Sequence, residues 1–147
     1  MNPFDIKTLL LEKHAQHVVL IHFPIALFIS GVALDFAAQW TRRRSLAIAA
    51  YTNLLLAAAG TLPALVTGVV AWQWALEGQR LKGILLMHLA FALLSTALIW
   101  VVWFIHFHSH RAVGKVLPMW RLALEFLGIA LLGLTGHLGG FLSGVNS

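Results

Sequence analysis

Histidines inside apolar segments are the residues of this sequence with the clearest capacity for chemistry. His22 lies in the run "LIHFPIAL", His88 in "LLMHLAF" and His137 in "GLTGHLGG". A neutral imidazole nitrogen binds transition metals and serves as an axial ligand of haem iron. The chain has eight histidines and no cysteine, which excludes disulfides, iron–sulfur clusters and thiolate metal sites made by this chain alone.

The segments around these histidines are long enough to cross a bilayer, which takes about 20 residues. Hydrophobic residues make up 60% of the chain and charged residues only 10%, against about a quarter charged in soluble domains. We predict one all-α domain over residues 1–147, an integral membrane four-helix bundle with up-down-up-down topology. The polar residues 1–16 are predicted to form a short interfacial helix. The predicted spans cover residues 17–40, 46–76, 83–107 and 119–143.

Lysine and arginine in the loops predict the orientation, because the more basic side of a membrane protein faces the cytoplasm. One side holds six basic residues, namely Arg42, Arg43, Arg44, Arg111, Lys115 and Arg121. The other side holds four, namely Lys7, Lys13, Arg80 and Lys82. This bias predicts a multi-pass protein of the bacterial inner membrane with both termini in the periplasm.

In this topology three histidines share one depth near the outer face. His22 and His88 lie about five residues from the outer ends of their spans and His137 about six, so each is about 7–9 Å below the boundary. His17 lies near the surface of the same half. A polar side chain in lipid must find a partner, and imidazoles at one level can converge on one metal ion or one flat macrocycle.

Glycines accompany these histidines. Gly136, Gly140 and Gly144 recur at every fourth residue of the fourth span, and Gly68 lies in the second. Small residues at this spacing let a helix approach another surface closely. That surface is either a neighbouring helix or the face of a porphyrin, and the sequence leaves both interpretations open.

A cysteine-free, histidine-rich bundle in a membrane favours b-type haem held by imidazole on both axial sides. We expect one haem b, or two if His17 is also a ligand. The expected cofactor-binding residues are His17, His22, His88, His137, Gly68, Gly136 and Gly140. Such a protein would transfer electrons between a membrane quinol and a periplasmic cytochrome or a respiratory complex. It would therefore be an electron-transfer subunit rather than a stand-alone enzyme.

Two other interpretations use the same residues. In the first, the histidines bond within the bundle of a non-catalytic structural or assembly subunit. In the second, they bind copper, zinc or iron without haem. No phosphate-binding loop, nucleophile elbow or zinc-protease motif occurs. Since the basic residues flank apolar runs, the expected partner is the lipid bilayer rather than nucleic acid, and a homo-oligomer is left open.

Ionisable residues also occur near the predicted cytoplasmic ends of the spans. Asp35 and Glu125 lie inside spans one and four, and Arg121 precedes Glu125 by four residues, so the two can share a helix face. We expect both carboxylates to pair with nearby arginines. His106 and His110 are predicted at the membrane edge, in contact with solvent or lipid headgroups.

The stretch "HVVLIHFPIAL", residues 17–27, resembles the "HPLLVHFPIAL"-type opening of the small bacterial membrane proteins of domain-of-unknown-function family 2231. The resemblance covers nearly the whole chain and includes Gly68 and Trp72 in "TGVVAW", His88, and the closing "GHLGG" around His137. Val18 departs from the proline that the family often has there. The resemblance implies a four-span bundle without an assigned activity. Some relatives are joined to cytochrome c-like or Rieske-like domains, which favours electron transfer.

Overall fold

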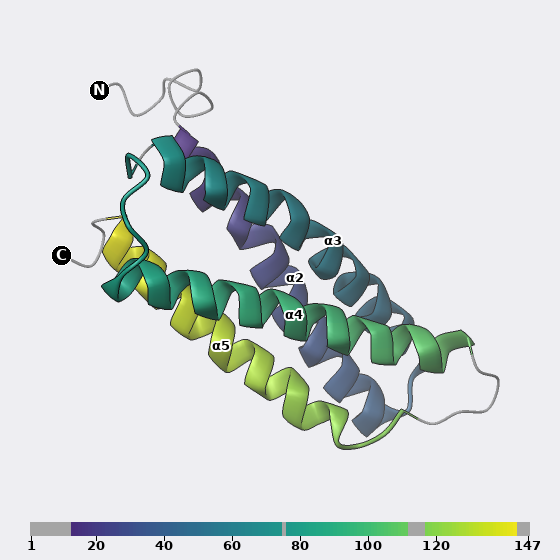
Figure 1. Cartoon of the computed structure of the whole chain (residues 1–147). Helices are drawn as coiled ribbons and strands as arrows, with labels where there is room; N and C mark the ends of the chain where they lie inside the picture. Colours follow the sequence, from purple (N-terminus) through teal and green to yellow (C-terminus); the bar gives the residue numbers. More distant parts are fainter. Residues whose placement is uncertain (1–12, 75, 112–116, 144–147) are drawn as a thin grey trace.

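Four long helices make up the described part of the protein. The computed structural model describes residues 13–74, 76–111 and 117–143. The helices are α2 (Lys13–Thr41), α3 (Arg44–Trp74), α4 (Gly83–Arg111) and α5 (Arg121–Leu142). The chain reverses direction after each helix, so neighbouring helices run up and down along one bundle (Figure 1). The predicted all-α bundle is confirmed, and no strand occurs in the part of the chain that the structure describes.

The helix ends differ from the predicted spans by a few residues. α2 begins at Lys13 rather than at 17, so residues 13–16 belong to this helix, while residues 1–12 of the predicted interfacial helix lie outside the described residues. α4 continues to Arg111 rather than ending at 107. α3 ends at Trp74, just before Glu77 and Gly78 adopt positive φ angles of 50° and 60°, which a right-handed helix does not contain.

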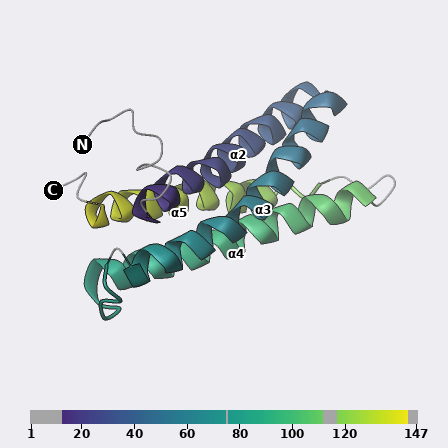
Figure 2. The same ribbon diagram turned by 90° about the horizontal axis from the view of Figure 1, so that it is seen from above.

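The bundle consists of two helical hairpins. α2 packs mainly against α3 and α4 mainly against α5, while α3 with α4 and α2 with α5 make the smaller contacts between the hairpins (Figures 1 and 2). Glycine allows the close approach of the helices. A Cβ atom at Gly31 would lie 3.0 Å from the side chain of Leu54, and one at Gly128 would lie 2.7 Å from the ring of Phe28. Small residues therefore allow close helix contacts both within the first hairpin and between the two hairpins.

A small apolar core fills the middle of the bundle, and many of the large apolar side chains outside this core face outward. The core comprises Phe28, Val32, Leu54, Ala57, Ala58, Ile99, Val102 and Leu132. Large apolar side chains such as Phe23, Val66 and Phe104 are about 60% exposed. All four helices are long and apolar enough to cross a membrane, and an apolar exterior is what contact with lipid requires.

Polar side chains also join the helices. The indole Nε1 of Trp100 on α4 donates to Thr61 Oγ1 on α3 at 3.1 Å, and the hydroxyls of Ser95 on α4 and Thr135 on α5 lie 3.2 Å apart. Such bonds stabilise helix association in lipid, where the hydrophobic effect between helices is absent.

The two ends of the bundle carry different chemistry. The His88 end contains the starts of α2 and α4 and the ends of α3 and α5. The Arg121 end contains the ends of α2 and α4 and the starts of α3 and α5. The predicted haem ligands belong to the His88 end, and the ionisable residues predicted inside spans one and four belong to the Arg121 end.

Candidate functional site

His88 on α4 lies against the neighbouring helix α5. Its Nδ1 lies 3.0 Å from the backbone carbonyl oxygen of Thr135. A carbonyl only accepts hydrogen bonds, so Nδ1 carries the proton and the neutral ring has its lone pair on Nε2. The ring also touches Gly139, where a Cβ atom would lie 3.2 Å from the imidazole Cε1. Bare backbone at Gly139 therefore allows this orientation of the imidazole.

His17 on α2 makes the corresponding contact with α3. Its Nδ1 lies 3.2 Å from Thr67 Oγ1, and that hydroxyl donates to the carbonyl of Pro63 at 2.9 Å. Because the hydroxyl hydrogen is already used, Thr67 accepts from His17 Nδ1. A Cβ atom at Gly68 would lie 3.1 Å from the His17 ring. Gly68 thus permits a close approach, as predicted, and the approaching group in the structure is an imidazole.

The two hairpins repeat one arrangement at the His88 end. In each, a histidine early in the first helix bonds through Nδ1 to a threonine of the second helix and packs on a nearby glycine. The first hairpin uses His17, Thr67 and Gly68, and the second uses His88, Thr135 and Gly139. Each imidazole is therefore oriented by its own hairpin.

His22 and His137 lie at the surface of the bundle. His22 is exposed, and its Nδ1 donates to the carbonyl of Val18 on the same helix. His137 is exposed, with its ring edge-on to Phe141 at 5.0 Å between centroids. The structure brings His17 and His88 into helix contacts and leaves these two outside. Measured from the observed helix ends, His17 lies about 6 Å and His88 about 7.5 Å inside their helices, whereas His22 lies about 13.5 Å inside.

The remaining predicted glycines lie on α5. A Cβ atom at Gly136 would meet nothing within 4 Å, and the residue is exposed. Gly140 is half-buried, and its carbonyl accepts a hydrogen bond from the Ser143 hydroxyl at 3.0 Å. Among the described residues, Gly136 therefore forms open, bare backbone beside His137 and does not pack against a neighbouring helix.

A second cluster occupies the Arg121 end. Arg121 on α5 is 1% exposed, and its Nε and NH2 donate to Asp35 Oδ2 on α2 at 2.9 and 2.6 Å. The guanidinium also donates to the carbonyl of Pro118 at 3.1 Å. The predicted pairing of the intramembrane carboxylates with arginine is confirmed for Asp35, and the structure identifies the partner as Arg121 on another helix.

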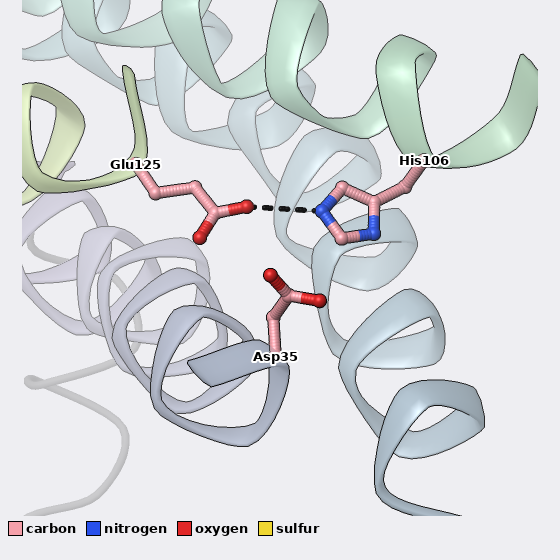
Figure 3. Close-up of side chains that lie close together, drawn as sticks. All are labelled: Asp35, His106 and Glu125. Carbon is pink, nitrogen blue, oxygen red and sulfur yellow. Dashed lines mark hydrogen bonds and ion pairs between the residues drawn. The ribbon is translucent and has the colours of Figure 1, made fainter. Parts of the chain in front are cut away.

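Glu125 and His106 complete this cluster. His106 Nε2 lies 3.0 Å from Glu125 Oε1, and Arg121 Nε lies 3.7 Å from the same oxygen. Glu125 is fully buried, and its Oε2 has no hydrogen-bond partner among the residues that the structure describes. Figure 3 shows the side chains of Asp35, His106 and Glu125 pointing toward one another from three helices. Ligand atoms of these three lie within 4.8 Å of one another, the only such group of three among the described residues.

The prediction for His106 was wrong. It was placed at the membrane edge in contact with solvent or headgroups, but it is 4% exposed because its side chain faces Glu125 inside the bundle. The sequence contains a signal for this position, since His106 continues a helical spacing of three and four residues that begins at Ser95. The residues at this spacing are the buried stripe of α4. That stripe is Ser95, Ile99, Val102 and His106. The side chain of His110 lies outside the described residues.

Comparison with known proteins identifies the family of this chain. The profile of a family described as "Predicted membrane protein (DUF2231)" matches residues 13–145, which include all four helices completely. No curated protein and no solved structure matches the chain.

Proposed function

This chain belongs to the DUF2231 family of predicted membrane proteins, and from that premise we propose that it is a b-type cytochrome-like electron-transfer subunit. Haem b would bind at the His88 end, with two axial ligands from among His17, His22, His88 and His137. When bound, haem supplies a one-electron carrier that alternates between the ferric and ferrous states. Quinol in the membrane and a periplasmic cytochrome or a redox complex are the proposed electron donor and acceptor.

The observation that carries the proposal is the orientation of His88. Its Nδ1 donates to the Thr135 carbonyl at 3.0 Å, which directs the Nε2 lone pair away from that bond. Ligating histidines are held in this way by a second interaction that fixes the tautomer and raises the basicity of the ligating nitrogen. His22 makes the same type of bond to Val18. The bare backbone at Gly136 adds support, because a flat ring requires helix surface without side chains.

Orientation and location are part of the same proposal. With the Arg121 end in the cytoplasm, the arginine-rich connection between α2 and α3 lies inside, as the positive-inside rule requires. The His88 end then faces the periplasm of a bacterial inner membrane, and so do both termini. This places the haem on the side where a periplasmic electron-transfer partner would dock.

The experiment is an absorption spectrum of the protein purified from membranes, with haem supplied during expression. We expect reduced-minus-oxidised difference bands of b-type haem. His88→Ala should lower haem content by about tenfold or more. His108→Gln, which changes an exposed histidine at the Arg121 end, is the matched control and should retain haem. A wild-type protein without these bands would end the proposal.

The hydrogen bonds of His17 and His88 also favour a second candidate, a non-catalytic structural or assembly subunit. Both rings are bonded within their hairpins and packed on glycine, so they can stabilise helix contacts without any cofactor. In that case single histidine variants would lower thermal stability and no preparation would contain haem. Metal analysis that finds copper, zinc or iron without a haem spectrum would identify the third candidate, a histidine metal site.

A further inference from the structure

The buried cluster at the Arg121 end is short of one positive charge. Asp35 and Glu125 contribute two negative charges and Arg121 one positive charge, while a neutral His106 contributes none. The four side chains are 4% exposed or less, so water does not compensate the difference. An uncompensated charge in the apolar interior of a membrane protein is costly, and such groups bind a counter-charge or lose their own.

We propose that the His106–Glu125 pair holds one exchangeable proton, which makes the Arg121 end a proton-binding site. The proton lies on the 3.0 Å line between His106 Nε2 and Glu125 Oε1, either as imidazolium with carboxylate or as imidazole with carboxylic acid. Both forms bring the cluster to zero net charge. The site does not depend on haem, because it lies at the opposite end of the bundle.

The neighbouring helices supply no other compensating charge. The charged and titratable groups around the pair are Asp35 from α2 and Arg121 from α5, in addition to the pair itself. α3 begins with Arg44, which is exposed, and from Ser45 to Trp74 it has no charged side chain and one titratable residue, Tyr51. Arg121 donates two of its hydrogen bonds to Asp35, so its charge acts mainly on that carboxylate, and Glu125 is left with the longer 3.7 Å contact.

A proton fits the cluster better than a divalent metal ion. Asp35, His106 and Glu125 offer a plausible donor set, and their ligand atoms lie within 4.8 Å of one another. However, Arg121 already places a cation against Asp35 Oδ2 at 2.6 Å. A divalent ion would raise the net charge of the cluster to plus one in a site of low dielectric constant, whereas a proton brings it to zero.

One atom of the cluster is available for proton exchange. Glu125 Oε2 is buried and accepts no hydrogen bond, although Oε1 of the same carboxylate bonds to His106. His106 lies five residues before the end of α4 at Arg111, about 7.5 Å along the helix axis. The pair is therefore within two helical turns of the end of α4, and we expect protons to exchange with the side of the membrane at the Arg121 end.

The test uses the full-length protein in lipid nanodiscs, labelled with ¹⁵N-histidine, at neutral pH. The signal of His106 is assigned by its loss in His106→Gln. We expect either imidazolium nitrogens at His106 or, with neutral His106, an infrared carboxylic acid band from Glu125. A neutral His106 without such a band would overturn the proposal, and this measurement needs only folded wild-type protein.

Glu125→Gln sharpens the test. The glutamine side chain has nearly the shape of glutamate but carries no negative charge, so the cluster no longer lacks a positive charge. His106 should be neutral in the variant at the same pH, whichever group carries the proton in wild type, and the variant should bind one proton fewer per chain than wild type. His108→Gln should leave the His106 signal unchanged, since His108 is exposed and stacks on Phe104. A stoichiometric metal ion present in wild type and His108→Gln, but lost from Glu125→Gln and His106→Gln, would also overturn the proposal.

Discussion

Arg121 and Asp35 are 86 positions apart in the sequence, yet two guanidinium nitrogens of Arg121 donate to the same oxygen, Oδ2, of Asp35. The pair connects α5 to α2 and therefore joins the two hairpins at the Arg121 end. The two hairpins also touch through α3 and α4, but α2 and α5 themselves make few other contacts. The stability of the bundle should depend strongly on this one ion pair.

Removing one partner should destabilise the fold. Arg121→Leu leaves Asp35 and Glu125 buried without a cation, and the expected loss is about 3–5 kcal/mol in the free energy of unfolding. Thermal unfolding in detergent measures the effect. Arg42→Gln, which changes an exposed arginine in the α2–α3 connection, should leave the midpoint almost unchanged. Equal midpoints for Arg121→Leu and wild type would contradict the structural role of the pair.

The contact between Gly128 and Phe28 predicts a second stability effect. A Cβ atom at position 128 would lie 2.7 Å from the buried Phe28 ring, so Gly128→Ala should cost about 1–3 kcal/mol through overpacking. Gly136→Ala should be neutral or slightly stabilising, because its Cβ atom meets nothing within 4 Å. Combining Gly128→Ala with Phe28→Leu should restore part of the loss, and a failure to do so would assign the effect to another contact.

Gly139 should control the position of His88. Gly139→Val places a branched side chain where a Cβ atom alone would be 3.2 Å from the imidazole, so the ring must leave the Thr135 carbonyl. If His88 is a haem ligand, haem content should fall in Gly139→Val and remain normal in Gly133→Ala, whose Cβ atom meets nothing within 4 Å. Haem content is measured per chain from the absorption spectrum. Normal haem in Gly139→Val would exclude His88 in its present orientation as a ligand.

Asp35→Asn should release the proton of the His106–Glu125 pair. The variant lowers the negative charge of the cluster by one, so Arg121 alone balances Glu125 and the additional proton is no longer needed. We expect neutral His106 nitrogens and an ionised Glu125 in Asp35→Asn at the pH where wild type holds the proton. Nuclear magnetic resonance and infrared spectra measure both groups. Retention of the proton would show that the charge deficit is not its cause.

The proposed orientation can be measured with introduced cysteines, because the chain contains none. Gln79→Cys lies in the α3–α4 connection at the His88 end, and Arg43→Cys lies between α2 and α3 at the Arg121 end. A membrane-impermeant maleimide should label Gln79→Cys in cells with a permeable outer membrane and label Arg43→Cys only after lysis. The cysteine-free protein is the control, and the reverse labelling pattern would invert the proposed topology.

The sequence predicts the helices well because the membrane imposes a simple rule on them. Twenty or so apolar residues are needed to cross, and the runs around His22 and His88 meet that condition without reference to the rest of the chain. The helix ends are less well predicted, since they depend on local turns. His106 is an example. With the third span ending at 107, His106 was predicted at the membrane edge, whereas the structure buries it inside the bundle.

Partners between helices could not be predicted from local patterns. Asp35 was expected to pair with an arginine, but several arginines lie near the same end, and only the packing of α5 against α2 selects Arg121. Gly68 was expected to permit a close approach, while the identity of the approaching group, His17, depends on how α2 packs on α3. In both cases the residue type predicts the kind of contact, and the tertiary structure determines which residue makes it.

The placement of the buried charges has a consequence for biogenesis. Among the described residues, Asp35 is the only buried charged side chain of the first hairpin, whereas Arg121, Glu125 and His106 all belong to the second. If the hairpin of α2 and α3 is inserted first, it carries an uncompensated acid, Asp35, in the bilayer until the hairpin of α4 and α5 is inserted. Docking of the later hairpin neutralises that acid and leaves Glu125 in need of a proton. Maturation of the bundle should therefore be accompanied by proton capture from the side of the membrane at the Arg121 end.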